Sequence, residues 1–294
     1  VRLRPIHEQD RECLLDLWNT AVPVYPLTET LLDEKIWSDP GFDASLSAVA
    51  ELNGQVVGFA LGVPRGTGEA DGTIKLFAVA PGYRLRGIGS RLLVHIEGEL
   101  SRLGASRVRM LESAPNYLTP GIDGRCDDAV AFAKARGYQV VGEAQNLVAR
   151  LESWREAPSL PPGVDVRRAC VADAASLYRF LVQHWPTWTP EAARALANDP
   201  PSLHLAWRDD EVIGFAAHDT NNIGTGWFGP MGVSPDLRQG GVGQALFAQC
   251  LDDIRAQGHD TATIAWVDNA GFYRKCAEVV DVQRFIRFEK VLSA

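Results

Sequence analysis

Two matching stretches decide the fold: VAPGYRLRGIGSRLL at residues 79–93 and VSPDLRQGGVGQALF at residues 233–247. They align without a gap, and the apolar positions that follow keep the same offset at helical spacing. Both runs stop at a glycine, Gly104 and Gly258, which suits the C-terminal end of a helix. Each stretch therefore predicts a tight glycine-rich turn that opens a long amphipathic helix.

Two further pairs of segments match in the same order along the chain. RPIHEQD at residues 4–10 is similar to RRACVAD at 167–173, and NGQVVGFA at 53–60 is similar to DDEVIGFA at 209–216. Chance can copy one short motif, but it does not explain several in one order. The sequence therefore predicts two copies of one fold.

A segment between the copies has the composition of a linker. SWREAPSLPPGVDV at residues 153–166 holds three prolines and a glycine, so we place the boundary near Pro158 and expect domains at 1–157 and 158–294. Each copy predicts a strand, two helices, a hairpin, a strand that enters the glycine turn and long helix, then a strand, a short helix and a final hairpin. That order predicts an α/β (α+β) fold, a mixed and mostly antiparallel sheet flanked by helices.

Length, composition and charge exclude several classes of protein. The 294 residues, 46% hydrophobic and 22% charged, are typical of globular domains. The net charge of −8 is shared by both halves and argues against a nucleic-acid partner. We find neither a run of about 20 apolar residues that would span a membrane nor a signal peptide. The five cysteines are scattered without a CxxC pair, so we expect no disulfide, no metal site and a cytoplasmic protein.

The glycine turns are suited to binding phosphate. Each reads V-x-P-x-x-R-x-x-G-x-G. A helix start offers unpaired N–H groups and the positive end of the helix dipole, and glycine removes the Cβ that would keep a phosphate away. A P-loop would need Gly-Lys-Ser/Thr, but Ser90 follows Gly89 directly and Gln244 follows Gly243. The turns therefore predict pyrophosphate sites, with a ligand-free tight turn as the alternative.

With these residues, the sequence resembles the GNAT (Gcn5-related N-acetyltransferase) superfamily, in which R-x-x-G-x-G after the fourth strand binds the pyrophosphate of acetyl-coenzyme A. The resemblance covers both halves and implies a tandem GNAT protein. It implies that the backbone of Phe77 and Val79, and of Met231 and Val233, lines the pantetheine arm and the acyl carbonyl. It also implies that backbone N–H groups of two runs hold the pyrophosphate: Arg84, Leu85, Arg86, Gly87, Ile88, Gly89 and Ser90, and Arg238, Gln239, Gly240, Gly241, Val242, Gly243 and Gln244.

A tyrosine is a suitable acid for the departing thiolate, because its ordinary pKa near 10 keeps it protonated at neutral pH. The family carries it on the helix after the fifth strand, in a pattern like F-Y-x-K-x-G-F. The second half reads FYRKCAE at residues 272–278, which puts Tyr273 in that place, although Ala277 and Glu278 depart from the pattern. The first half reads FAKARGY and has Ala133 instead. We predict Tyr273 as the catalytic acid and the second half as the catalyst, with a core role for Tyr273 as the alternative.

The sequence does not single out a general base. Glu112 and Asp268 follow the fifth strands, and His218 and Asp219 end the hairpin of the second half. For each of them, a solvated polar group at a strand end is the favoured explanation. The base therefore stays open.

The loops where the resemblance places acceptor specificity are rich in aromatic residues. They hold Trp18, Tyr25 and Trp37 in the first half and Trp185 and Trp188 in the second. Such residues close the core, or stack on a sugar or a cation. The turn-rich loop YLTPGID at residues 117–123 resembles loops of tandem GNAT segments found beside bacterial glycosidases. It points weakly to an amino sugar.

Together these features predict an acetyl-coenzyme A-dependent N-acetyltransferase that acts on the primary amine of a small molecule. Acetyl-coenzyme A is the expected cosubstrate, and neither nucleic acid nor a membrane is an expected partner. Two fused copies predict a monomer that mimics a dimer, with a homodimer as the alternative. The alternative functions are an acyl-coenzyme A-binding sensor or scaffold without turnover, and a protein N-acetyltransferase.

Overall fold

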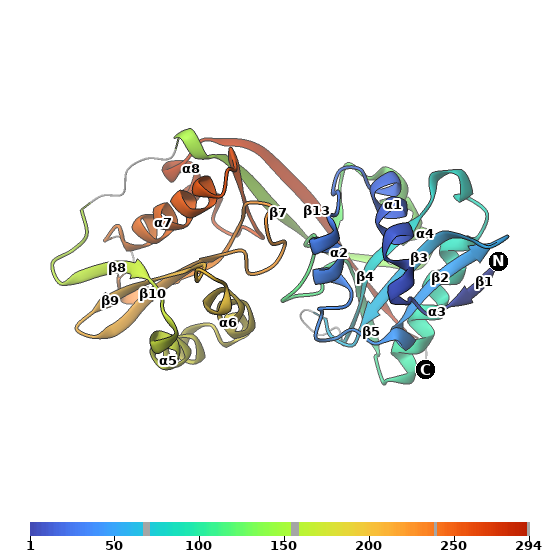
Figure 1. The fold of residues 1–294 in the computed structure, drawn as a ribbon, viewed down its shortest axis with the longest axis horizontal. Helices are drawn as coiled ribbons and strands as arrows, with labels where there is room; N and C mark the ends of the chain where they lie inside the picture. The colour runs from blue at the N-terminus through green and yellow to red at the C-terminus, as the bar shows by residue number, and fades with distance from the viewer. Residues whose placement is uncertain (67–70, 154–158, 238–239, 293–294) are drawn as a thin grey trace. The chain divides into compact units, whose positions relative to one another are not determined.

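The computed structural model describes residues 1–66, 71–153, 159–237 and 240–292. It divides into two compact units, which we call unit 1 (Val1–Ala144 with Arg284–Ala294) and unit 2 (Gln145–Gln283) (Figure 1). The boundary expected near residue 158 lies outside the described residues, so the limits 1–157 and 158–294 stay a prediction. No helix within the described ranges has the length and apolar character needed to cross a membrane.

The two halves of the chain repeat one order of elements. The first half contains β1 (Arg2–Arg4), α1 (Arg11–Ala21), α2 (Glu29–Lys35), β2 (Ser47–Leu52), β3 (Gln55–Val63), β4 (Gly72–Val79), α3 (Ile88–Arg102), β5 (Arg107–Met110), β6 (Ile122–Asp123), α4 (Asp127–Ala135) and β7 (Gln139–Arg150). The second contains β8 (Val164–Arg168), α5 (Ala174–His184), α6 (Thr189–Ala197), β9 (Leu203–Arg208), β10 (Glu211–His218), β11 (Trp227–Val233), α7 (Val242–Ala256), β12 (Thr261–Ile264), α8 (Ala270–Cys276) and β13 (Val279–Val291). The predicted α/β fold of two repeats is confirmed.

Both units contain a mixed, mostly antiparallel sheet. In unit 1 the order is β1-β2-β3-β4-β5, with antiparallel pairing except between β4 and β5, and in unit 2 it is β8-β9-β10-β11-β12, parallel only between β11 and β12. The strand beside β5 is the end of β13, with Glu289 opposite Arg109. The strand beside β12 is the end of β7, with Val148 opposite Thr263. Each sheet is therefore completed by the final strand of the other repeat.

The prediction of a final hairpin in each half is wrong. One uninterrupted strand takes its place, β7 in the first repeat and β13 in the second. Neither segment contains an Asn-Gly or Asp-Gly pair that would turn the chain back, so the backbone continues in extended conformation.

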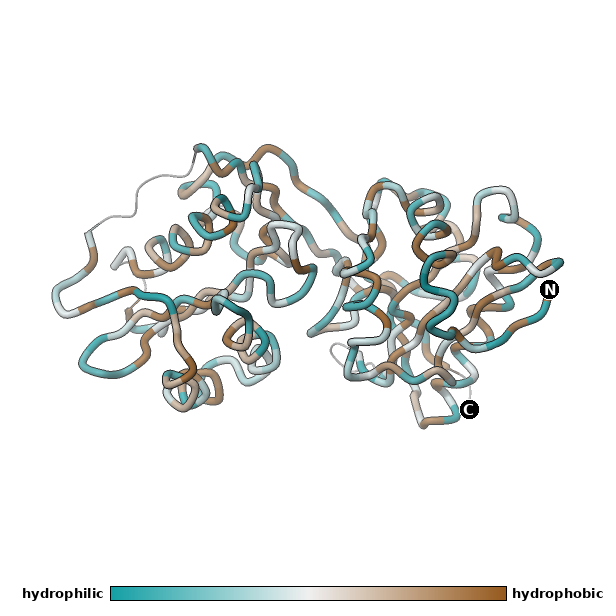
Figure 2. The backbone as a smooth tube through the Cα atoms, viewed as in Figure 1, coloured by the Kyte–Doolittle hydropathy of each residue, from teal (hydrophilic) through white to brown (hydrophobic). Residues whose placement is uncertain are grey.

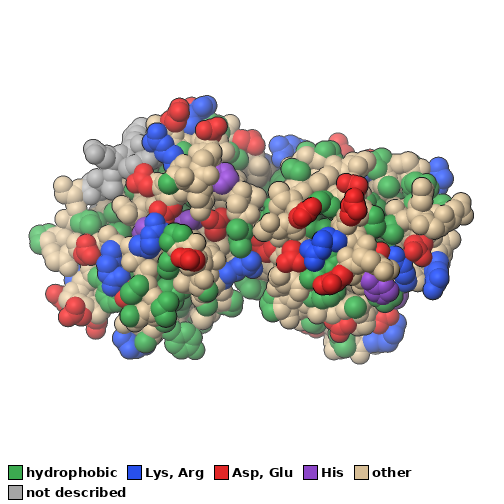
Figure 3. Space-filling model, viewed as in Figure 1, with side chains coloured by type: hydrophobic (Ala, Val, Ile, Leu, Met, Phe, Trp, Pro, Cys, Tyr) green, Lys and Arg blue, Asp and Glu red, His purple; other side chains and the backbone are tan. Residues whose placement is uncertain are grey.

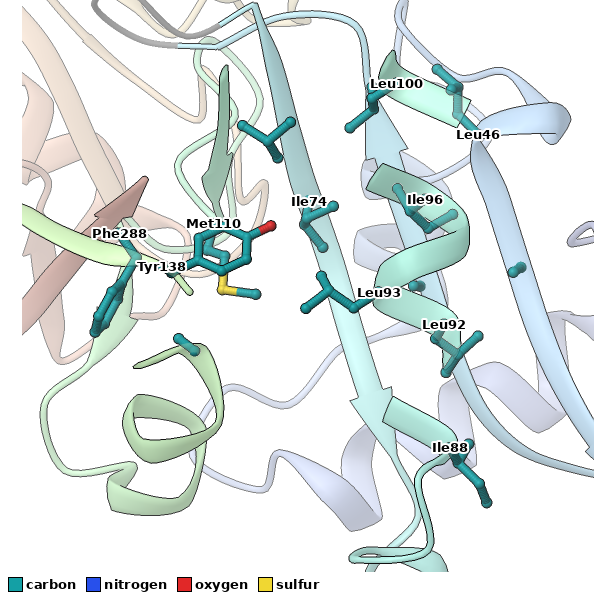
Figure 4. Packing of buried hydrophobic residues seen from close by; sticks show 14 of the residues in the cluster. Leu46, Ile74, Ile88, Leu92, Leu93, Ile96, Leu100, Met110, Tyr138 and Phe288 are labelled. Atoms are coloured by element: carbon teal, nitrogen blue, oxygen red, sulfur yellow. The ribbon is translucent and has the colours of Figure 1, made fainter. Parts of the chain in front are cut away.

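Helices cover both faces of each sheet. In unit 1, one cluster joins α3 to the sheet, and Figure 4 shows Leu93 and Ile96 of α3 beside Ile74 of β4. A second cluster joins α1 and α2 to the opposite face. Unit 2 repeats this arrangement with α7 on one face and α5 and α6 on the other. Apolar and polar residues alternate along the helices, while the central strands are largely apolar (Figure 2). Full burial of one leucine such as Leu92 contributes about 1.5–3 kcal/mol.

Candidate functional site

In both units, two neighbouring strands separate as they approach the glycine turn. β4 pairs with β5 only over residues 72–74, and the last bond runs from the Leu111 N–H to the Ile74 carbonyl at 2.8 Å. β4 nevertheless continues to Val79. Within the part of the chain that the structure describes, no strand extends this pairing, so the edge of β4 is open beyond Ile74. An extended ligand can bond to such an edge through its amides.

Unit 2 has the same opening. β11 pairs with β12 at Trp227 and Phe228, and one more bond joins the Ala265 N–H to the Phe228 carbonyl at 3.2 Å. Met231 and Val233, the residues expected beside the acyl group, lie further along β11. The structure thus brings Phe77 and Val79, and their counterparts in unit 2, to open strand edges that lead to the turns.

Each turn brings backbone N–H groups to a helix start. Gly87 and Gly241 cap α3 and α7 with φ of 77° and 78°, a left-handed conformation that favours glycine. Neither cap supplies a side-chain hydrogen bond. Among the described residues, the N–H groups of Ile88, Gly89 and Ser90 have no acceptor. These orphan donors and the helix dipole suit the phosphates of a ligand.

Not all of the predicted phosphate donors are available. Arg238 and Gln239 lie outside the described residues, and the Arg84 N–H already donates to the Pro81 carbonyl at 3.3 Å. In unit 1, the first arginine of the motif does not extend over the turn. Arg84 Nε donates to the Val79 carbonyl at 3.2 Å and Nη2 donates to the Ala21 carbonyl at 2.9 Å. Its side chain therefore fastens the turn to the end of α1.

A cation that sequence reasoning missed lies at the start of α3. Arg136 Nε donates to Ser90 Oγ at 2.9 Å, and its guanidinium lies 5.4 Å from the centre of the Phe132 ring. Arg136 falls on an unspecified position of the F-Y-x-K-x-G-F pattern, so the motif does not mark it. The matching residue of unit 2 is Cys276, so only unit 1 has this cation.

Tyr273 is held by aromatic rings while its hydroxyl is left without a partner. The ring meets Phe228, Phe247 and Phe272 edge-on, with centroids 6.1, 5.3 and 5.0 Å away. In the described structure its hydroxyl makes no hydrogen bond. Burial, and secondarily the nearby Cys276 and Asp268, raise the pKa of Tyr273, so the hydroxyl stays protonated at neutral pH. Such a group is available as a proton donor.

The corresponding place in unit 1 has no donor. Ala133 is fully buried in the core of unit 1. The departure from the family pattern after Tyr273 is accommodated, because Ala277 ends α8 in an extended conformation (φ −147°), whereas Gly137 follows α4 with φ of 86°. The turn therefore does not need the missing glycine.

Three of the four candidate bases are engaged in ion pairs. Glu112 is fully buried and accepts bonds from Arg109 Nη1 at 2.8 Å and Arg287 Nε at 2.6 Å. His218 is buried between two carboxylates, those of Asp219 and Asp253, each 3.1 Å from one ring nitrogen. These groups hold the structure together and are not free to accept a proton.

Asp268 is the remaining candidate base. Its side chain is exposed just before α8, and within the described ranges it has neither a hydrogen bond nor an ion pair. Its charge acts on Tyr273, as noted above. A carboxylate at that place can receive a proton directly or through water.

The point at which β4 and β5 separate is filled by buried charge in unit 1. Lys75, fully buried, bonds to Asp39, whose second oxygen accepts from Arg65 Nη1 at 2.7 Å. Burial lowers the pKa of Lys75 to about 7. Burial alone would raise the pKa of Asp39, but Arg65 and Lys75 hold it at about 2. Unit 2 has Gly229 in place of Lys75.

The aromatic residues of the first two-helix loop are structural in unit 1. Trp18 is buried and its Nε1 donates to the Tyr25 carbonyl at 2.8 Å, while the Tyr25 hydroxyl donates to Asp123 Oδ2 at 2.5 Å. Trp37 lies under the Arg11 guanidinium at 4.1 Å. In unit 2, by contrast, Trp185 and Trp188 are only half-buried.

Comparisons with known proteins agree with this geometry. A model described as the acetyltransferase (GNAT) family matches residues 9–122 and 169–277. The mycothiol acetyltransferase of Cellulomonas flavigena is 27% identical over 234 residues, which cover 69% of this chain and 64% of that protein.

Two solved structures share the fold. One is the GCN5-related glucosamine N-acetyltransferase region of a fungal multi-domain GH3 β-N-acetylglucosaminidase (TM-score 0.79, 18% identity, 98% of this chain and 38% of that chain). The other is a tandem GNAT protein from the clavulanic acid biosynthesis pathway (TM-score 0.68, 16% identity, 100% of this chain and 99% of that chain).

Proposed function

Because the chain belongs to the acetyltransferase (GNAT) family, we propose that it transfers the acetyl group of acetyl-coenzyme A to the primary amine of a small molecule, with unit 2 as the catalytic half. The observation that carries this proposal is the state of Tyr273. Its ring is fixed by three aromatic neighbours and its hydroxyl is uncommitted in the described structure, whereas unit 1 has Ala133 there. Tyr273 is half-buried and its hydroxyl is not enclosed, so a ligand can reach it.

Different residues of unit 2 bind the cosubstrate, position the thioester and transfer protons. The N–H groups around Gly241 hold the diphosphate, and the open edge of β11 aligns the pantetheine amides and the thioester. Asp268, directly or through water, takes a proton from the substrate ammonium, and the free amine attacks the thioester carbonyl. The C–N bond forms, the C–S bond breaks, and Tyr273 gives its proton to the thiolate. The tyrosinate recovers a proton from the nitrogen of the new amide.

We assign a different task to unit 1. It keeps the glycine turn, the open edge of β4 and a cation at Arg136, which together suit acetyl-coenzyme A binding. It lacks the tyrosine, and Lys75 and Asp39 fill the point where the strands part. We propose that it binds acetyl-coenzyme A without transferring the acetyl group.

The acceptor proposed is a small amine rather than a protein. Mycothiol acetyltransferase and the glucosamine N-acetyltransferase region are named for small acceptors, which supports this class. The half-buried indoles of Trp185 and Trp188 support it too, because a closed aromatic surface fits a compact molecule better than a peptide.

Thiol release from acetyl-coenzyme A, measured with a panel of amino sugars, polyamines and amino acids, tests the proposal. We expect Tyr273→Phe to lower kcat about 100-fold or more while leaving the Kd for acetyl-coenzyme A unchanged. Tyr178→Phe is the matched control, because Tyr178 is exposed on α5. Near-normal turnover of Tyr273→Phe would refute the assignment of the acid. Binding without thiol release on any amine would establish the sensor or scaffold instead.

A further inference from the structure

A buried ion pair stands at the start of the open edge of β4. On the face of unit 1 shown in Figure 3, charged side chains are spread over the surface, but Lys75 and its partner Asp39 are buried. Lys75 is the first residue of β4 beyond Ile74, where the pairing with β5 ends, and Asp39 follows α2. The side chain of Lys75 therefore fills space beside the start of the edge on which a thioester would lie.

The connection from β5 to α4 closes the same place from a second side. It runs over residues 111–126, and Asn116 within it donates from Nδ2 to Asp39 Oδ2 at 2.9 Å. Arg65, which also holds Asp39, donates from Nε to the Ala114 carbonyl at 3.1 Å. The buried residues of this connection include Glu112, Ser113, Tyr117 and Thr119. The charges around Lys75 are thus paired and their surroundings are packed with protein.

Unit 2 is open at the matching place. The ungapped alignment puts Gly229 in place of Lys75, and a Cβ on Gly229 would meet nothing within 4 Å among the described residues. The connection from β12 to α8 is reduced to residues 265–269, of which Asp268 and Asn269 are exposed. An acyl group therefore has space beside the first open residue of β11 that it does not have beside β4.

The contacts that unit 1 gains lie further along the edge, toward the glycine turn. The rings of Phe77 and Phe132 are stacked at the start of α3, with centroids 5.3 Å apart, and both are half-buried. The Arg136 guanidinium lies 5.4 Å from the centre of the Phe132 ring. Unit 2 has Met231 and Cys276 in place of the first ring and the cation. Unit 1 thus gains contacts for the pantetheine arm and the diphosphate, which every form of coenzyme A has in common.

We propose that unit 1 binds coenzyme A by its pantetheine arm and diphosphate alone, so that free coenzyme A binds as tightly as acetyl-coenzyme A. The filled space at Lys75 offers the acetyl group no contact, while the aromatic pair and Arg136 hold parts of the molecule that do not change in the reaction. Unit 1 is then a site for the product of the transfer as well as for its cosubstrate. The inference rests on the proposed function, in which unit 2 alone transfers the acetyl group.

Calorimetry on two matched variants tests the inference, because each variant keeps one site. Gly241→Glu puts a carboxylate where unit 2 would hold the diphosphate and leaves the site of unit 1, and Gly87→Glu does the converse. In Gly241→Glu, the Kd values for free coenzyme A and acetyl-coenzyme A are expected to agree within about twofold. In Gly87→Glu, acetyl-coenzyme A is expected to bind about fourfold more tightly, since its methyl group is buried beside Gly229. The wild-type protein, titrated with each ligand, is expected to show this difference at one site only.

Two substitutions of Lys75 in the Gly241→Glu protein separate the effect of volume from that of charge. Lys75→Gly recreates the space at Gly229 and is expected to give unit 1 a preference of about fourfold for acetyl-coenzyme A. Lys75→Met keeps the space filled and is expected to leave the two Kd values equal. Asp39 keeps Arg65 as a partner in both variants, so neither leaves its carboxylate unpaired.

A preference of unit 1 for acetyl-coenzyme A equal to that of unit 2 would overturn the inference. An unchanged ratio of Kd values in Lys75→Gly would overturn the part assigned to Lys75, and the ligand comparison in Gly241→Glu decides the inference even if Lys75→Gly does not fold. If neither ligand binds to Gly241→Glu, the binding role of unit 1 fails and the inference fails with it. Thiol release with the amine panel tests the transfer by unit 2 separately, because it does not depend on which form of coenzyme A unit 1 prefers.

Discussion

Alanine substitution of two matched glycines is expected to act in opposite directions in the two repeats. Gly89 and Gly243 both occupy the second residue of the helix after the glycine turn. A Cβ on Gly243 would lie 3.6 Å from its nearest neighbours, an ordinary contact, so Gly243→Ala is expected to stabilise α7 by about 0.5–1 kcal/mol through helix propensity.

A Cβ on Gly89 would lie 3.2 Å from the Phe77 ring and 3.3 Å from the Phe132 ring. Those rings are stacked on each other at 5.3 Å, so neither can move without disturbing the other. Overpacking of this kind costs about 1–3 kcal/mol, which exceeds the gain in helix propensity. The net expectation for Gly89→Ala is a loss of about 1 kcal/mol.

Hydrogen exchange followed by mass spectrometry on peptides of α3 and α7 measures each helix in the intact chain. Exchange is expected to become about fivefold faster in α3 of Gly89→Ala and about two- to fivefold slower in α7 of Gly243→Ala. Gly98→Ala is the control within α3, because its Cβ would meet nothing within 4 Å. Slower α3 exchange in Gly89→Ala, equal to that in Gly98→Ala, would refute the reasoning, since it would mean that the ring pair yields freely.

Three further predictions concern charged groups. The pKa of Lys75 is lowered to about 7, so between about pH 7 and the ordinary lysine pKa the unfolded chain binds more protons than folded unit 1. The free energy of unfolding of unit 1 should therefore rise with pH in this range. Urea titrations at several pH values should show this rise, and Lys75→Met should abolish it. Burial alone would lower the pKa of His218, but the carboxylates of Asp219 and Asp253 outweigh burial and raise the pKa above 6.5. The stability that protonated His218 gives unit 2 should therefore be complete below pH 6.5 and be lost as pH rises. His218→Gln should remove this pH dependence. Arg136→Gln should weaken acetyl-coenzyme A binding to unit 1 up to about fivefold in calorimetry, with the unit 2 site unchanged; equal weakening at both sites would contradict the placement of this cation.

The features that could be predicted from the sequence are those determined by residues close together in the chain. The glycine turns could be recognised because the left-handed conformation at Gly87 and Gly241 favours glycine, and the helix that follows shows as apolar residues at helical spacing. Tyr273 could be found because it sits in a short motif. The repeat itself is visible because its residues keep one offset over whole elements.

What sequence analysis missed depends on partners far away in the chain. Glu112 looked like a candidate base because nothing nearby in sequence reveals Arg287 as its ion-pair partner. His218 looked available for the same reason, since its partner Asp253 lies 35 residues away in the sequence. The exchange of β7 and β13 between the two sheets is not encoded locally either, because each strand would have the same pattern beside its own repeat.

The two repeats differ at residues near the open strand edges, and both differences leave unit 2 with the more accessible site. Unit 1 has a buried ion pair at Lys75 where unit 2 has glycine, and a core alanine where unit 2 has the uncommitted hydroxyl of Tyr273. A buried charge is costly unless it is paired, and unit 1 pairs Lys75 with Asp39 at this place. Where unit 1 has the buried Ala133, unit 2 has a half-buried tyrosine whose hydroxyl is not enclosed. A proton donor that a ligand can reach is therefore present at this motif position in unit 2 and replaced by alanine in unit 1, and this difference favours unit 2 as the half in which chemistry takes place.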